Sequence, residues 1–257
     1  MKVITIANQK GGCGKSTTAA ALAALLAQDG YRVLCIDMNE QSDLSETLGA
    51  AAGGTGSIGL FPGAEPLKLV QDSRLAGVWI IPAGEDIGLL DMQLQTTGRD
   101  RALLLEKALH PLRRPYRYCI IDAPGSFNTA MLNALAVSDM VIIPAQADAY
   151  SLKGVRRIIG NIRHVQATVN PALQIGGILL TRYQGRRNLS KDAIAALQEA
   201  EKAMGVKLFA AKIRENSKIA EAPGMKKTII EYAPGSIGAI DYKAFYQELK
   251  DILQEGR

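Results

Sequence analysis

The chain has 257 residues, of which 47% are hydrophobic and 21% are charged, a composition typical of a globular protein with one large domain. No apolar run approaches the roughly 20 residues that a membrane-spanning helix needs, and the first residues do not resemble a signal peptide. The three cysteines form no C-x-x-C pair and the two histidines lie far apart, so neither a disulfide framework nor a zinc site is expected.

Short apolar runs alternate with longer amphipathic segments along the chain. The apolar runs predict strands at residues 3–7, 32–37, 78–82, 118–122, 140–144, 174–181 and 207–213. The amphipathic segments predict helices at 16–28, 101–109, 129–137, 152–168, 190–204 and 242–253. Strands that are apolar throughout and are separated by helices indicate a parallel sheet buried on both faces. We therefore expect one α/β domain over residues 1–257, with a mostly parallel, twisted sheet, helices on both faces and a surface loop at 49–66.

A glycine-rich loop joins the first predicted strand to the first predicted helix. It reads Gln9-Lys10-Gly11-Gly12-Cys13-Gly14-Lys15-Ser16-Thr17. Glycines let backbone N–H groups turn around phosphate oxygens, and the following helix adds the positive end of its dipole. In such a loop Lys15 can reach the β- and γ-phosphates of a nucleotide, and the Ser16 hydroxyl can ligate Mg²⁺. The strict G-x-x-x-x-G-K-[ST] pattern is not met, because Gln9 stands at its first glycine.

Two further predicted strands end in an aspartate, Asp37 and Asp122. The carboxyl ends of parallel strands meet at one edge of a sheet, where an aspartate can hold the Mg²⁺ that accompanies a nucleotide. An aspartate at a strand end also commonly caps the next helix. The loop that carries Lys15 favours the metal role for Asp122.

These segments resemble the motifs of the ParA/MinD family of ATPases. The loop resembles that family's deviant Walker A motif, K-G-G-x-G-K-[ST], whose hallmark is the early lysine. Residues 37–41 resemble its first switch segment, usually D-x-D-P-Q, and residues 122–126 resemble its second. The similarity continues at 132–144, 213–216 and 221–223, and it is weakest at 50–77.

The resemblance implies a P-loop NTPase fold that binds ATP or ADP with Mg²⁺. The implied nucleotide contacts are Lys10, Gly11, Gly12, Cys13, Gly14, Lys15, Ser16, Thr17 and Asn216. The implied magnesium site comprises Ser16, Asp37 and Asp122.

The resemblance also bears on dimerisation and hydrolysis. In that family the early lysine, Lys10 here, crosses a dimer interface to the partner's nucleotide, which implies a homodimer in the ATP state. Asn39 replaces the aspartate that the family uses to position or activate the attacking water. An asparagine can hydrogen-bond a water but is no carboxylate base. We therefore expect Lys10, Lys15 and Asn39 to support only weak hydrolysis, whether Asn39 is native or a substitution that traps the ATP state.

Basic residues gather in the last third of the chain. Residues 182–227 contain eleven Lys or Arg and five Asp or Glu, in a chain of formal net charge +5. Arg186 resembles the family's DNA-binding arginine and Lys218 another basic position of the pattern, and Arg187 and Arg214 complete the expected DNA contacts. Such side chains would bind phosphates, which gives sequence-independent and salt-sensitive binding. From charge alone, a solvated surface is an equal alternative.

The resemblance thus implies an ATP-dependent DNA partition protein that is cytoplasmic and nucleoid-associated. Its ATP dimer would bind DNA non-specifically, a ParB-like partner protein would stimulate hydrolysis, and no membrane contact is expected. A MinD-like membrane ATPase is the nearest alternative, but the charges of the helix at 242–253 are balanced, which favours packing on the sheet. A cargo-positioning ATPase and a nucleotide-gated binding module with little turnover also stay open. An iron–sulfur relative is disfavoured because Cys119 lies inside a predicted strand.

Overall fold

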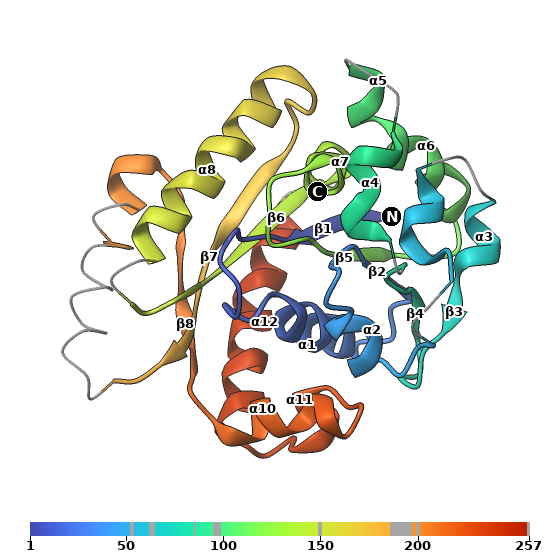
Figure 1. Cartoon of the computed structure of the whole chain (residues 1–257). Helices are drawn as coiled ribbons and strands as arrows, with labels where there is room; N and C mark the ends of the chain where they lie inside the picture. The colour runs from blue at the N-terminus through green and yellow to red at the C-terminus, as the bar shows by residue number, and fades with distance from the viewer. Residues whose placement is uncertain are drawn as a thin grey trace.

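The computed structural model describes residues 1–51, 54–61, 65–84, 86–94, 99–148, 151–185, 197–198 and 201–255. Within these residues an eight-stranded sheet has the order β3-β4-β2-β5-β1-β6-β7-β8 (Figure 1). Neighbouring strands are parallel except β3 and β4. The strands are β1 (Lys2–Ile6), β2 (Val33–Asp37), β3 (Gln71–Asp72), β4 (Val78–Ile81), β5 (Tyr118–Asp122), β6 (Met140–Gln146), β7 (Gln174–Tyr183) and β8 (Leu208–Arg214).

Helices cover both faces of this sheet (Figure 1). On one face lie α1 (Lys15–Gln28), α11 (Ile229–Tyr232) and α12 (Ile237–Glu255). On the other lie α6 (Leu104–Leu109), α7 (Thr129–Val137) and α8 (Ser151–Thr168). Every residue of β2 and β5 is buried, as expected for strands covered on both sides. The predicted α/β fold is therefore confirmed.

Shorter helical elements complete the described chain. They are α2 (Asp43–Thr47), α3 (Pro66–Leu69), α4 (Leu90–Gln93), α5 (Arg99–Ala102), α10 (Ser217–Gly224) and the 3-10 turns η1 (Gly56–Leu60), η2 (Ile87–Leu89) and η3 (His110–Leu112). The helix predicted at 101–109 is in fact two helices, α5 and α6, because the helical conformation is interrupted at Leu103. The helix predicted at 190–204 falls largely outside the described residues.

The stretch 49–66 is not wholly the surface loop that its composition predicted. All five residues of η1 are buried, and Ile58, Leu60 and Phe61 belong to the core beneath α6. Gly56, at φ 45°, lies so close to Gly84 that a Cβ would come within 2.5 Å of the Gly84 nitrogen. The glycines of this stretch thus permit a close backbone approach, where the composition predicts only a surface loop.

Helix α12 packs on the sheet, as its balanced charges predicted. The rings of Phe245 and Phe209 on β8 meet edge to face with centroids 4.9 Å apart, and the Tyr242 hydroxyl lies 3.2 Å from the Thr18 hydroxyl of α1. Glu248 accepts hydrogen bonds from the N–H groups of Ala210 and Ala211, at 3.0 and 2.6 Å, where the pairing of β8 with β7 is irregular. These bonds give two N–H groups of the edge strand β8 a partner outside the sheet. Among the described residues, no helix is both long and apolar enough to cross a membrane.

Candidate functional site

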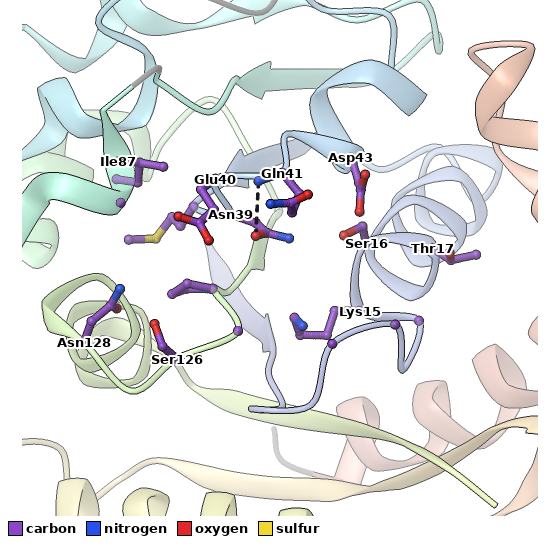
Figure 2. Close-up of a pocket in the computed structure, with 17 residues that line it drawn as sticks. Lys15, Ser16, Thr17, Asn39, Glu40, Gln41, Asp43, Ile87, Ser126 and Asn128 are labelled. Carbon is purple, nitrogen blue, oxygen red and sulfur yellow. Dashed lines mark hydrogen bonds between the residues drawn. The ribbon is translucent and has the colours of Figure 1, made fainter.

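A cleft of about 710 Å³ opens at the carboxyl ends of β1, β2 and β5 (Figure 2). This volume lies within the range of roughly 300–1,000 Å³ found for small-molecule sites. Its walls are the loop before α1, the segment after β2, the turn at η2 and the segment after β5. Strand β1 lies between β5 and β6, and the connections that leave β1 and β5 run to opposite sides. Ligands of open α/β sheets bind at such a reversal of strand order.

The glycine-rich loop is shaped as an anion cradle. Gly12 and Gly14 have φ angles of 67° and 87°, which only glycine adopts without strain, and α1 begins directly after Gly14. The Gln146 side chain donates to the Gly12 carbonyl at 2.6 Å, and the Thr181 hydroxyl donates to the Cys13 carbonyl at 2.8 Å. With these carbonyls bonded to β6 and β7, the loop N–H groups and the positive end of α1 are left for a ligand.

The two lysines of the loop have different environments. The Lys15 ammonium is nearly buried at the cleft, 3.4 Å from the Lys10 carbonyl oxygen to which it donates. The Lys10 ammonium, which does not line the cleft, forms an ion pair with Asp148 on the segment between β6 and α8. Each of these two side chains is about one-third exposed, 28% and 34%. In this single chain, Lys10 is therefore held by a carboxylate of its own subunit.

Asp122 lies fully buried beneath the cleft, level with Asp37 on the neighbouring strand. Within the described part of the chain neither of its carboxylate oxygens has a hydrogen-bond partner. Burial, and then the nearby Asp37 carboxylate, raise the pKa of Asp122 well above its ordinary value. The Ser16 hydroxyl and the Lys15 ammonium lower this pKa, but by less. A buried carboxylate without a partner is costly, so this position calls for a cation or a proton.

The surroundings of Asp122 suit a magnesium ion that takes most of its ligands from elsewhere. The described residues contain no group of three His, Cys, Asp or Glu that could hold a metal alone. Magnesium commonly binds through one or two carboxylates and completes its shell with waters and substrate phosphates. The donor set of one orphaned carboxylate beside one hydroxyl fits that pattern.

Asp37, the other aspartate predicted to bind metal, is occupied by its own loop. One oxygen accepts from the Asn39 N–H at 3.0 Å, and the other accepts from the N–H and hydroxyl of Ser45 at 2.9 and 2.7 Å. Burial raises the pKa of Asp37 to about 6, although these hydrogen bonds act in the opposite direction. The structure thus places Asp37 beside Asp122 and uses it to fix the chain between β2 and α2.

Asn39 lines the cleft and is 8% exposed. Its amide oxygen accepts from the Gln41 N–H at 3.4 Å, the contact dashed in Figure 2. Glu40 and Asp43 also line the cleft, on opposite sides of Asn39 in this view, with Asp43 next to Ser16 (Figure 2).

Comparison with known proteins decides the family. A family model described as an AAA domain matches residues 1–175. The chromosome-partitioning ATPase Soj of Thermus thermophilus is 39% identical over 98% of this chain and 96% of its own. This chain belongs to the Soj/ParA family of P-loop ATPases. The sporulation initiation inhibitor protein Soj of Bacillus subtilis is 34% identical over 96% of this chain and 98% of its own.

Solved structures of similar proteins share the whole fold. A cobyrinic acid a,c-diamide synthase from Mycobacterium smegmatis, solved with an ATP analog and magnesium, superposes with a TM-score of 0.85 at 29% identity over 100% of this chain and 97% of its own. The cell division ATPase MinD of Pyrococcus furiosus has a TM-score of 0.78 at 22% identity over 98% of this chain and 99% of its own, which shows the fold alone. The family model and the Soj relatives confirm the family resemblance carried by the loop and switch segments, and the solved structures confirm the fold.

The structure brings together only part of the residue set that the family motifs predicted. Gly11, Gly12, Gly14, Lys15, Ser16, Thr17 and Asn39 line the cleft, whereas Cys13 is buried behind it. Asn216 does not line the cleft, and its side chain caps α10 by accepting from the Lys218 N–H at 2.8 Å. The role of Asn216 as a base contact stays a prediction.

The residues expected to bind DNA have acidic neighbours where the structure describes them. The Arg214 guanidinium makes hydrogen bonds of 2.6–3.2 Å to both carboxylate oxygens of Asp241. The Lys218 ammonium lies 2.8 Å from Glu221. Arg186 and Arg187 lie outside the described residues.

Sequence reasoning missed several residues that shape the cleft. Gln146 and Thr181, which hold the loop carbonyls, lie near the carboxyl ends of their strands. The signal in the sequence is a polar residue at or near the end of an apolar run, as for the aspartates that end β2 and β5. Ile87 and Gly88 follow β4 and line the cleft without any recognisable motif.

Proposed function

We propose that this Soj/ParA-family chain is an ATP-dependent DNA partition protein. The observation that carries the proposal is the pairing, in one cleft, of an anion cradle at the start of α1 with the orphaned carboxylate of Asp122. A nucleoside triphosphate with Mg²⁺ supplies the anion and the cation that these two features call for. ATP is the nucleotide proposed here, because the Soj relative of Thermus thermophilus is named as a chromosome-partitioning ATPase.

The loop residues have distinct roles in this proposal. Backbone N–H groups of residues 11–17 bind phosphate oxygens, and Lys15 neutralises the β- and γ-phosphates. Asp122, with Ser16, would hold magnesium, which supplies charge neutralisation at the phosphates when bound. Asp37 keeps the segment after β2 in place, and a direct part for it in the metal shell also stays a prediction.

Lys10 is proposed to link nucleotide binding to dimerisation. Its ion pair with Asp148 would be exchanged for the phosphates of a nucleotide bound to a second copy, where a further cation stabilises transferring charge. ATP would then bridge two subunits in a sandwich dimer.

The dimer is proposed to bind DNA without sequence preference. Two copies of the basic carboxyl-terminal third, including Arg186, Arg187, Arg214 and Lys218, would act together, which raises affinity without new contacts. A ParB-like partner protein would stimulate hydrolysis and reset the cycle, in a cytoplasmic, nucleoid-associated protein without membrane contact.

Asn39 favours a second candidate, a nucleotide-gated binding module with little turnover. An amide cannot accept the proton of an attacking water at neutral pH. The two candidates share ATP binding, dimerisation and DNA binding, and they differ in whether hydrolysis is part of the cycle.

A fluorescent ATP analogue titrated into wild type and Lys15→Ala, with Mg²⁺ and with EDTA, tests the core of this proposal. We expect saturable binding by wild type with Mg²⁺ and a loss of at least about tenfold in affinity for Lys15→Ala. Equal binding by both proteins would rule the proposal out.

A further inference from the structure

Two carboxylates line the described part of the cleft, those of Glu40 and Asp43. Asp37 and Asp122 lie fully buried beneath it. Asp43 begins α2 on the side where Ser16 and α1 lie, whereas Glu40 lies on the side of Ser126 and Asn128 (Figure 2). The two acidic groups therefore face different parts of a bound nucleotide.

The Glu40 carboxylate is not engaged in any described interaction. It is exposed, and within the described chain it has no hydrogen-bond or ion-pair partner. The turn η2 leaves room for it, because a Cβ on Gly88 would come within 2.7 Å of the Glu40 Oε2. The bare glycine thus lets the carboxylate lie against the η2 turn, where both residues line the wall of the cleft.

The position of the phosphates fixes where an attacking water must stand. The start of α1, with Lys15 and Ser16, marks the phosphate end of the cleft. A nucleophile attacks roughly in line with the leaving group, so the water lies beyond the terminal phosphate, toward the segments after β2 and β5. Of the groups there, the Asn39 amide and the Ser126 hydroxyl can orient a water, but neither can take its proton at neutral pH.

We propose that Glu40 is the catalytic residue that accepts the proton of the attacking water. The inference rests on the proposed ATPase function and names the base within that same site. The water oxygen bonds to the γ-phosphorus while the bond from that phosphorus to the β–γ bridging oxygen breaks, and ADP leaves with the electron pair. The proton passes from the water to the Glu40 carboxylate and then to solvent, which this exposed side chain reaches directly.

The test uses Glu40→Gln and Glu40→Asp, with Glu46→Gln as a matched control from the exposed surface of α2, outside the cleft lining. Affinity for a fluorescent ATP analogue is measured first, and hydrolysis of radiolabelled ATP is then followed in single turnover. We expect the ATP affinity of Glu40→Gln to lie within about twofold of the wild-type affinity. Its hydrolysis rate should fall by about 100-fold or more, because loss of a general base typically costs at least that factor. Glu40→Asp should retain part of the rate, and Glu46→Gln all of it.

A second carboxylate checks the assignment against simple damage to the loop. In an Asn39→Asp background, a base one residue away should make Glu40→Gln much less harmful than in wild type. A single-turnover rate of Glu40→Gln within twofold of wild type would overturn the inference while leaving ATP binding intact. A wild-type chain that binds ATP but converts none of it over hours would also overturn it, whereas a chain that binds no ATP would refute the proposed function itself.

Discussion

At the bottom of the cleft, Asp122 and Asp37 occupy the same level of neighbouring strands and meet different surroundings. Asp37 is satisfied by Asn39 and Ser45, whereas Asp122 is satisfied by nothing in the described chain. Residue type and strand position were identical in the sequence. The difference arises because the segment after β2 turns back over its own aspartate, so that, of the two, only the Asp122 carboxylate is left without a hydrogen-bond partner in the described chain.

Asp122→Asn should stabilise the nucleotide-free protein. Because burial raises the pKa of Asp122, the folded chain binds this proton more tightly than the unfolded chain, and wild type loses stability as the pH rises through the folded pKa. The variant lacks this loss, so its advantage in Tm should grow as the pH rises above the ordinary pKa of an aspartate. An increase of roughly 1 kcal/mol in the free energy of unfolding raises Tm by about 2–4 °C for a chain of this size.

Differential scanning fluorimetry at several pH values, with and without Mg²⁺ and ATP, measures this effect. Asp251→Asn, on the exposed face of α12, is the control and should follow wild type. The Asp122→Asn variant should also lose the Mg²⁺-dependent part of ATP binding. A variant less stable than wild type at pH 8 without nucleotide would contradict the picture of an unsatisfied carboxylate.

Asn39→Asp should raise the steady-state rate of phosphate release by about tenfold or more, because it adds a carboxylate at a nearly buried position of the cleft. Phosphate release is measured with and without DNA at saturating ATP. Equal rates for the variant and wild type would show that the asparagine is not what limits hydrolysis.

At the scale of elements, the phosphate loop depends on strands far from it in sequence. Its carbonyls at Gly12 and Cys13 are bonded to Gln146 on β6 and Thr181 on β7, more than a hundred residues later. The motif predicted the loop's ligand, but it gave no sign of the strands that orient its peptide groups. Sequence patterns report spacing along the chain, whereas these hydrogen bonds exist only once β6 has paired with β1 and β7 has paired with β6.

Thr181→Val removes the donor to the Cys13 carbonyl while keeping the side-chain volume. Leaving a buried acceptor without its partner should cost about 1–3 kcal/mol of unfolding free energy and weaken ATP binding several-fold. Urea denaturation and the fluorescent ATP titration measure the two effects. Thr168→Val, whose hydroxyl bonds to its own helix at an exposed site, is the matched control and should leave ATP affinity unchanged. Unaltered ATP affinity in Thr181→Val would show that the loop holds its shape without this bond.

At the scale of the whole molecule, the candidate nucleotide site lies at the carboxyl ends of the central strands, and the basic residues gather in the carboxyl-terminal third of the chain. The basic residues are not all free, since Arg214 and Lys218 are each paired with a carboxylate of α12 or α10. Binding to DNA phosphates would have to exchange these ion pairs. The pair of Lys218 with Glu221 is exposed on both sides and therefore weak, whereas Arg214 makes several hydrogen bonds to the buried Asp241 and would be costlier to release.

DNA binding should depend on ATP and fall steeply with salt. We expect tighter binding of a random-sequence duplex with ATP than with ADP or without nucleotide, and a linear decrease of log affinity with log salt. Lys218→Ala should reduce that slope by about 1 for each subunit of the bound dimer. Lys68→Ala is a matched control, because Lys68 also pairs at 2.8 Å with a glutamate three residues away, Glu65, but lies outside the basic third. Binding that is indifferent to nucleotide would remove the proposed ATP switch.

The sequence by itself determined the parallel α/β fold, the phosphate loop and the family, because each depends on periodicity or spacing within a short stretch of chain. It could not distinguish the satisfied Asp37 from the unsatisfied Asp122, the buried η1 from a surface loop, or the free Glu40 from any other glutamate. Those differences were decided by the tertiary structure alone, since burial and hydrogen bonding depend on which distant segments the sheet brings together.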